Sequence, residues 1–327
     1  MNSIVFCGSI IADVIKTVPT WPDKGMLVPI TGIRRQVGGA VCNSGVDLKT
    51  LDPAVDVRAV GAVGADDNGD FVVNCLASHG LDCSQIRRIK DVPTSFTDVM
   101  TVESTGERTF FNMHGADSAL VPEDIDVSRL GCDIFHFGYL LLLDGMDAPD
   151  PEYGTKAARL LASVQAAGIK TSIDIVSEQS DRFARIVRPA LRYCDYCIVN
   201  EIEGSMATGA PADDLRAICE GLLAAGVREQ AVVHCPDAGA SLDRRGDFAR
   251  VGSLKLPQGW IKGSVGAGDA FCAGTLYAIM KGMDAEQALR LGSCAAATNL
   301  SVTDSISGAK SYAETIALDS EFARREA

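Results

Sequence analysis

The sequence predicts an α/β fold built on a largely parallel sheet, with a small β-flap attached to it. Apolar, strand-like runs alternate with helical patterns through most of the chain, which is typical of βαβ units. Two stretches rich in turn-forming residues interrupt this alternation and have the composition of short antiparallel strands. The 327 residues are 47% hydrophobic and 22% charged, which is normal for a protein that buries a large core.

The elements of the main body follow in order along the chain. Six apolar runs are expected to form buried strands, at residues 4–7, 57–63, 133–137, 170–175, 196–199 and 231–234. Helical patterns lie between them, at residues 39–50, 67–79, 152–167, 180–191 and 212–225. Two further helices rich in Ala and Leu are expected at residues 267–281 and 284–299.

The flap is expected from two separate stretches. Residues 13–37 contain short β-type pieces separated by turn formers such as Pro19 and Gly25. Residues 94–113 read as a hairpin whose loop contains Gly106. No linker, repeat or low-complexity segment is visible in the sequence, so we expect one domain, residues 1–327, that carries the flap.

The charge balance excludes one class of partner. The chain has 30 basic and 43 acidic residues, a net charge of −13 and a pI near 4.8. Proteins that bind DNA or RNA rely on a basic face, so no nucleic-acid partner is expected. No apolar run is long enough for a transmembrane helix, so no membrane partner is expected either.

Cysteine usage predicts a reducing compartment. The eleven cysteines are spread over a chain much longer than a secreted disulfide scaffold. The N-terminus reads as a strand rather than as a signal peptide, so a cytoplasmic protein is expected. The single CxxC pattern, CDYC at residues 194–197, lacks a second ligand pair and leads into an apolar run. We interpret its cysteines as core residues.

The most informative segment is GSVGAGDAF at residues 263–271. A helical pattern starts here, so glycines at its first turn leave backbone amides open to an anion, and the helix dipole adds to the attraction for phosphate. Asp269 would repel a phosphate, unless it accepts a proton from a hydroxyl that attacks the phosphoryl group. Alternatively, Asp269 only stabilises the first turn. Neither a Walker A motif nor a GxGxxG fingerprint is present.

At this point the sequence resembles the ribokinase-like (PfkB) carbohydrate kinases. GAGDAF at 266–271 is similar to the family's C-terminal signature, and VGGAVCN at 37–43 to its N-terminal one. VGAVGADDNG at 60–69 and NEIE at 200–203 are similar to further family motifs, in family order. The resemblance implies a three-layer αβα sandwich with a mostly parallel central sheet, and a small β-sheet lid formed by about 13–37 and 94–113.

The resemblance implies an ATP-dependent kinase that transfers the γ-phosphoryl group to a primary hydroxyl of a small sugar. Asp269 would be the catalytic base, and the amides of residues 266–268 would form the anion hole. Glu203 would hold Mg²⁺ through water, with Asn200 beside it on the same helical turn. A solvated helix cap is the alternative for this pair. The residues implied at the catalytic turn and the nucleotide are Asn200, Glu203, Gly239, Gly266, Ala267, Gly268, Asp269 and Asn299.

The sugar is expected on the other side of the same site. The resemblance points to Asp13, Gly38, Gly39 and Asn43, with Arg108 reaching from the lid. Asp13 and Asn43 offer hydrogen-bonding groups to hydroxyls, and the glycines let the backbone approach closely. A tight strand-to-helix turn also explains the glycines, and Arg108 could equally be an exposed lid residue. Relatives often pair through their lids, so a homodimer is expected.

Three departures from the family pattern refine this picture. Gly263 stands where potassium-activated relatives carry Asp, so activation by a monovalent cation is not expected. Pro236 cannot donate an amide hydrogen bond, so one nucleotide contact is expected to be lost or replaced. Asp144 lies near the position of a ribose-contacting Glu in ribokinases, which weakens a ribose assignment. The roles of Asp144 and His114 stay open.

Two other functions remain open on the sequence alone. A nucleoside kinase would use the same machinery, with lid residues such as Phe110 and Phe111 packing against a base. A sugar-binding protein without catalytic activity is the second, and the intact glycine turn and Asp269 argue against it. The identity of the sugar is not determined by the sequence.

Overall fold

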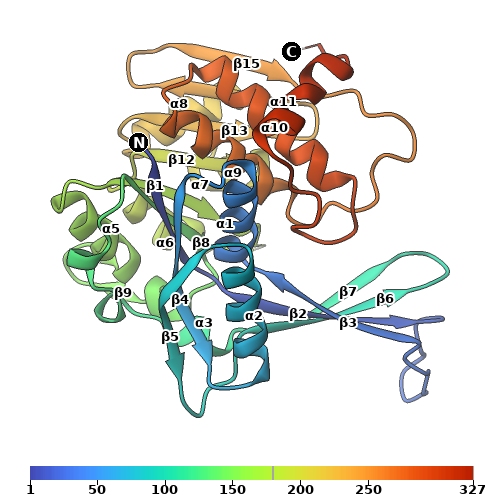
Figure 1. The fold of residues 1–327 in the computed structure, drawn as a ribbon. Helices are drawn as coiled ribbons and strands as arrows, with labels where there is room; N and C mark the ends of the chain where they lie inside the picture. The colour runs from blue at the N-terminus through green and yellow to red at the C-terminus, as the bar shows by residue number, and fades with distance from the viewer. Residues whose placement is uncertain (179, 327) are drawn as a thin grey trace.

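Residues 1–178 and 180–326 are described by the computed structural model, in which nine strands form a central sheet between two helical layers (Figure 1). All neighbouring strands from β13 to β5 run parallel, and β14 and β15 add an antiparallel edge. The spatial order is β15 (Phe248–Gly252), β14 (Ala238–Asp243), β13 (Gln230–His234), β12 (Tyr196–Asn200), β11 (Lys170–Ile175), β8 (Ile134–Leu140), β1 (Ser3–Gly8), β4 (Asp56–Gly64) and β5 (Asp82–Ile89).

Each face of the sheet has its own hydrophobic core, as expected for strands that are buried on both sides. One face is covered by α1 (Ala40–Leu51), α2 (Asp67–Ser78), α9 (Ala267–Met280) and α10 (Ala285–Leu300). The other face is covered mainly by α5 (Lys156–Ala166), α6 (Phe183–Leu191) and α8 (Leu215–Ala225). The predicted three-layer αβα architecture is therefore confirmed.

Shorter elements complete the chain. The helices are α3 (Gly115–Ala119), α4 (Asp144–Asp147), α7 (Glu201–Thr208) and α11 (Tyr312–Glu321), with 3-10 turns at Pro122–Asp124 and Val127–Arg129. Strands β9 (Pro149–Asp150) and β10 (Gly154–Thr155) form a two-stranded pair.

All six predicted strands and all seven predicted helices are present, with small shifts at their ends. The sequence did not predict β5, β14, β15 or α11. Strand β5 lies at the edge of the sheet and has many polar residues, so it lacks a continuous apolar run. Strand β14 has the sequence AGASLD, whose small residues have low β-propensity although most of them are buried.

Both flap segments belong to one separate four-stranded sheet, which we call the small sheet. Its order is β3 (Gly32–Gly38), β2 (Ile11–Val18), β6 (Phe96–Val102) and β7 (Arg108–Met113). The two outer pairs are antiparallel, and β2 pairs with β6 in parallel. In Figure 1 these strands project from the body to one side.

The α1 and α9 helices lie beside each other and run in the same direction. Asn43 near the start of α1 contacts Asp269 near the start of α9, and Asp52 at the end of α1 accepts a hydrogen bond from Tyr277. Both helices begin at a glycine with a positive φ, Gly39 at 85° and Gly266 at 82°. Their N-termini therefore meet at the same place, next to the end of the small sheet.

The cysteines are free thiols in the described chain. Cys194 and Cys197 of the CxxC pattern are fully buried at the entry to β12, as predicted for core residues. Within residues 1–178 and 180–326, none of the helices has both the length and the apolar composition needed to cross a membrane.

Candidate active site

A cavity of about 260 Å³ opens at the carboxyl ends of β11, β12 and β13, beside the first turn of α9. In open parallel sheets this edge is the usual place for a ligand. The residues that line it come from six elements, β8, β11, β12, β13, α7 and α9, and from the loop after β11: Tyr139, Asp174, Ile175, Val176, Ser177, Asn200, Glu203, His234, Gly268 and Asp269.

The first turn of α9 has free backbone donors. Gly266 caps the helix with a left-handed φ of 82°, and none of the described side chains caps this end. The amide of Ala267 donates a long bond of 3.3 Å to the carbonyl of Ser264, whereas the described residues provide no acceptor for the amides of Gly266 and Gly268. Two of the three predicted anion-hole amides are thus available to a ligand, in the positive field of the helix N-terminus.

Asp269 is held in place by three neighbours. The hydroxyl of Tyr139 donates to Oδ1 at 2.5 Å, and the amide of Asn43 donates to Oδ2 at 2.9 Å. Ser44 Oγ lies 3.2 Å from the backbone carbonyl of Asp269. Burial raises the pKa of the Asp269 carboxyl, and these donors oppose that rise by stabilising the charged form.

Asn200 and Glu203 form a reciprocal cap at the start of α7. The Glu203 amide donates to Asn200 Oδ1 at 2.8 Å, and the Asn200 amide donates to Glu203 Oε2 at 3.0 Å. Ser177 Oγ donates to the other carboxylate oxygen of Glu203 at 2.7 Å. Burial raises the pKa of Glu203 to about 7. The predicted helical cap is present, and its carboxylate also faces the cavity.

The cavity concentrates acidic groups that fit a hard divalent cation. Asp174, Glu203 and Asp269 all line it, and burial, followed by the charge of the neighbouring carboxylates, raises the pKa of Asp174. Three carboxyl groups in one desolvated space repel each other unless they are protonated or share a cation. Since both Glu203 oxygens already accept hydrogen bonds, they suit a Mg²⁺ ion that keeps its water ligands.

The predicted sugar residues lie on the small-sheet side of Asp269. Asp13 on β2 is mostly buried, and burial raises its pKa to about 6. A Cβ at Gly38 would lie 2.6 Å from Asp13 Oδ2, so this glycine makes room for the carboxylate. Gly39 caps α1, and Asn43 in its first turn joins this group to Asp269 through the 2.9 Å bond. The structure therefore brings Asp13, Gly38, Gly39 and Asn43 to one region.

Arg108 is not brought next to Asp13. In the small sheet, Asp13 pairs with Thr97, and Arg108 pairs with Thr101, four residues further along β6. Four residues of strand span about 13 Å, so Arg108 lies on the same face but far from the Asp13 row. Arg34 is nearer on that face, where it donates to Thr303 at 3.4 Å.

Gly239 and Asn299, both predicted at the nucleotide, lie near the cavity but do not line it. Gly239 on β14 pairs with His234 on β13, and His234 lines the cavity, so Gly239 lies directly behind a lining residue. Asn299 is buried at the end of α10, and its side chain donates to the carbonyl of Ser305 at 2.7 Å. Ser305 in turn lies against Gly266, so Asn299 supports the α9 turn from behind.

Several cavity residues were not predicted. Tyr139 is part of a continuous apolar run, which gave no sign of a polar contact. Asp174 is an acidic residue at the carboxyl end of a predicted strand, and that position was a usable signal. His234 lies in the segment that departs from the family pattern, and a Cβ at Gly268 would be 3.6 Å from its ring. Its ring packs against Phe271, with centroids 4.6 Å apart and the ring planes tilted by 34°.

His114 and Asp144, whose roles the sequence left open, contact each other. His114 Nδ1 and Asp144 Oδ2 are 2.9 Å apart. His114 follows β7 and Asp144 starts α4, so this contact joins the small sheet to the body.

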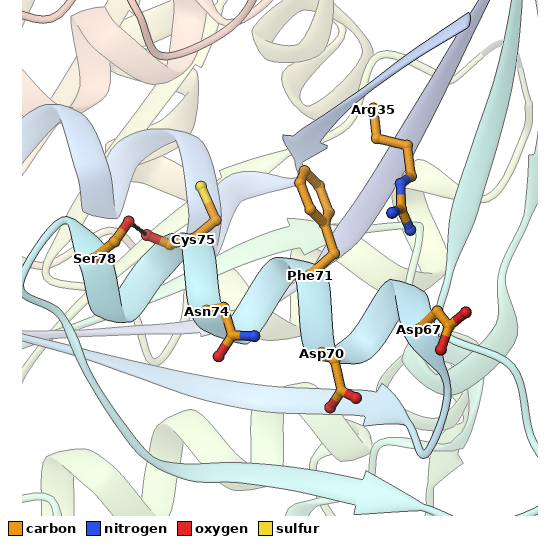
Figure 2. Close-up of a pocket in the computed structure, with 7 residues that line it drawn as sticks. All are labelled: Arg35, Asp67, Asp70, Phe71, Asn74, Cys75 and Ser78. Atoms are coloured by element: carbon orange, nitrogen blue, oxygen red, sulfur yellow. Dashed lines mark hydrogen bonds between the residues drawn. The ribbon is translucent and has the colours of Figure 1, made fainter.

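A larger, open groove of about 510 Å³ lies on α2, away from these residues (Figure 2). Arg35 of β3 reaches over it, with its guanidinium 5.0 Å from the centre of the Phe71 ring. The remaining lining residues are Asp67, Asp70, Asn74, Cys75 and Ser78. None of the predicted catalytic or nucleotide residues lines this groove. The candidate active site is therefore the cavity of about 260 Å³, although the groove is larger.

Known proteins match most of the length of this chain. A family described as pfkB family carbohydrate kinase matches residues 1–311. The ATP-dependent ribose-1-phosphate kinase of Halopiger xanaduensis is 27% identical over 308 residues, which cover 91% of this chain and 92% of that protein. The 5-dehydro-2-deoxygluconokinase of Shouchella clausii is 24% identical over 298 residues, covering 88% of this chain and 87% of that protein.

A solved structure shows the same fold. Arabidopsis thaliana ribokinase complexed with ribose and ATP matches with a TM-score of 0.80 at 21% identity, and the match covers 97% of this chain and 98% of that one. These three proteins carry three different substrate names, so the comparisons define a fold and a reaction class more narrowly than they define a sugar.

Proposed function

The chain belongs to the pfkB family of carbohydrate kinases, and we propose that it transfers the γ-phosphoryl group of ATP to a primary hydroxyl of a small sugar. The observation that carries this proposal is the position of Asp269. Its carboxylate lies at a glycine turn with free amides and faces the same cavity as Glu203. It also accepts a hydrogen bond from Asn43, which belongs to the proposed sugar side of the site.

Each group has a distinct part in the proposed reaction. Asp269 accepts the proton of the attacking hydroxyl, and the amides of Gly266 and Gly268 stabilise the charge that develops on the transferring group. Asn200 and Glu203 are placed to hold the water ligands of Mg²⁺, which when bound neutralises the phosphate oxygens. The small sheet acts as the lid that excludes water from the sugar.

Release of ADP, measured over a panel of pentoses, hexoses, sugar phosphates, sugar acids and nucleosides, tests the proposed function. We expect turnover with one or a few sugars and little with nucleosides. Activity on nucleosides alone would change the proposed substrate from a sugar to a nucleoside. Tight binding of a sugar without any ADP release would instead identify a binding protein that lacks catalysis.

One observation supports the nucleoside alternative. In the small-sheet register, Phe110 pairs with Val99 and lies on the face of Asp13 and Thr97, and its side chain is 58% exposed. An aromatic ring on this face could stack on a base. Its neighbour Phe111 points to the opposite face, so only one of the two rings is available for that role.

Gly38→Ala is expected to weaken sugar binding selectively. The new methyl group would displace the Asp13 carboxylate, and a hydrogen bond to a charged group is worth roughly 1.5–3 kcal/mol, or about tenfold to hundredfold in affinity. Steady-state kinetics should show this loss in kcat/KM for the sugar, with KM for ATP nearly unchanged.

Gly32→Ala is the matched control on the same strand. A Cβ at Gly32 would make only ordinary contacts with Thr17, at 3.5 Å and beyond. Equal losses in the two variants would contradict a specific role for Asp13, since they would show that β3 merely tolerates no substitution.

We also propose that the protein is a homodimer paired through its small sheets. Most of the large exposed apolar side chains lie on this sheet or in residues 19–31 before β3: Trp21, Met26, Leu27, Ile30, Ile33, Phe110, Phe111 and Met113. A monomer rarely leaves so many large apolar side chains uncovered in one region, and pairing two copies around a two-fold axis is the commonest way to cover them.

Ile33→Glu is expected to convert the dimer to a monomer in light-scattering measurements, because the charge would enter the buried interface. Ile33 is 67% exposed in the single chain, and Ile261, which lies outside the small sheet and residues 19–31, is 60% exposed. Ile261→Glu should therefore leave the dimer intact. A monomeric wild-type protein would refute the proposed pairing.

The cytoplasm is the proposed compartment. Its support is the set of free thiols, several of them half-exposed, which persist most readily under reducing conditions.

A further inference from the structure

A buried group of metal-binding side chains lies directly behind the cavity. His136 comes from β8, Asp174 from the neighbouring β11, and Cys272 from α9, one turn after Asp269. Their exposed fractions are 0%, 8% and 1%, and Asp174 alone also lines the cavity. The reaction proposed above uses neither the imidazole nor the thiol.

The three ligand atoms lie close enough for one ion. All of them are within 4.8 Å of one another, and Cys272 Sγ is 4.0 Å from His136 Nε2. Around a tetrahedral zinc ion with bonds of about 2.0–2.3 Å, ligand atoms lie roughly 3.3–3.8 Å apart. Side-chain shifts of up to about an ångström would therefore bring all three into coordination distance.

The histidine already has the partner that orients metal ligands in proteins. Its Nδ1 lies 3.1 Å from Ser172 Oγ, so in the Nδ1–H tautomer the ring donates a hydrogen bond to the hydroxyl and its Nε2 lone pair is directed toward Cys272. The edge-on contact with Phe6, with centroids 5.3 Å apart, fixes the ring plane.

Charge also favours a divalent ion at this place. Cys272 and Asp174 are buried, and within the described residues their hydrogen-bond partners are His136 and the Ile175 amide, with no Lys or Arg. A dication bound to one thiolate, one carboxylate and one neutral imidazole leaves no net charge in the interior, and the displaced protons pass to solvent. The mixed sulfur and nitrogen ligands select a thiophilic ion over Mg²⁺.

We propose that His136, Asp174 and Cys272 bind one thiophilic divalent cation of the zinc type, which reaches them through the cavity. The fourth coordination position is on the side of the cavity, which Asp174 lines, and a water molecule there can complete the tetrahedron. Asp174 belongs both to this group and to the lining of the cavity, so a bound ion would turn its carboxylate away from the nucleotide side of the cavity. If the proposed kinase reaction is correct, the bound ion would therefore inhibit it.

Cobalt(II) chloride, added alone to the full-length reduced protein under anaerobic conditions, is the probe. We expect one equivalent to bind with a thiolate-to-cobalt charge-transfer band, and excess Mg²⁺ should leave the band in place. Cys272→Ala should lose this band, and His136→Gln should weaken cobalt binding by at least tenfold. Cys219→Ala removes a buried cysteine of α8 outside the group and should keep the band.

Half-exposed cysteines contribute equally to the cobalt spectra of wild type and Cys272→Ala, so subtracting one spectrum from the other removes their contribution. Cys272→Ser, which keeps the shape of the side chain, serves if the alanine variant does not fold. Identical spectra for wild type and both Cys272 variants would overturn the proposal, as would the absence of stoichiometric binding by wild type. These readouts do not depend on kinase activity, so they remain decisive if the proposed reaction is wrong.

Discussion

Asp269→Asn is expected to lower kcat by about 10²–10⁴-fold, the usual contribution of a general base, while ATP and sugar still bind. Asparagine keeps the size and polarity of the side chain, so Tyr139 and Asn43 retain a partner at this position. The amide cannot take up the proton of the attacking hydroxyl. Single-turnover kinetics with separate measurements of ATP and sugar affinity would show the loss in the chemical step.

The pH profile gives a second readout of the same change. A carboxylate that must accept a proton is inactive below its pKa, and burial raises the pKa of Asp269. Glu203 must be ionised to hold the water ligands of Mg²⁺, and burial raises its pKa to about 7. Wild-type turnover is therefore expected to fall as the pH is lowered through about 7. In Asp269→Asn, any residual activity should lose the part of this dependence that belongs to the base.

Asp67→Asn is the matched control for Asp269→Asn. Asp67 also lies in the first turn of a helix, α2, but it is exposed and outside the cavity. If Asp269 only stabilised its helix, the two variants would behave alike. Near-normal turnover of Asp269→Asn would remove the carboxylate from the proposed mechanism.

Gly266→Ala is expected to reduce kcat by about 10²–10³-fold, as for the loss of one anion-hole donor. The residue has a φ of 82°, and a Cβ would lie 2.8 Å from the carbonyl oxygen of Ser305. The turn must shift to relieve this contact, and the amides then lose their common direction. Left-handed backbone at a non-glycine residue also costs about 1–3 kcal/mol of folding stability.

Gly282→Ala separates these two effects. Gly282 follows the other end of α9 with a φ of 71°, and no described atom lies within 4 Å of a Cβ placed there. We expect a similar backbone cost in thermal or chemical unfolding, with kcat close to wild type. A comparable drop in kcat in this variant would attribute the Gly266 effect to a weakened helix.

The sequence predicted those parts of the site that depend on local pattern. The glycine turn before Asp269 and the Asn200–Glu203 cap each fit within one helical turn, so their spacing alone specified their geometry. The alternation of strands and helices likewise predicted the layers, because parallel strands require crossover helices.

Contacts between distant segments were beyond the sequence. Asn43 and Asp269 are 226 positions apart, and nothing in either segment indicated a direct hydrogen bond. Tyr139 and His136 lie in apolar strand residues, where a polar role has no local signature. The distance between Arg108 and Asp13 depended on hairpin register, and each residue of register changes it by about 3.3 Å.

The central pair of the small sheet has a consequence for how the chain folds. Strands β2 and β6 pair in parallel, and the ladder joins Ala12 to Phe96, 84 positions apart. Closing so long a segment costs conformational entropy, and such non-local pairing forms slowly unless the intervening chain is already ordered. The intervening segment contains α1, β4, α2 and β5, so the small sheet is expected to be completed late, after this part of the body has folded. A nascent chain that ends before β6 would carry the Asp13 strand paired with β3 on one edge and unpaired on the other.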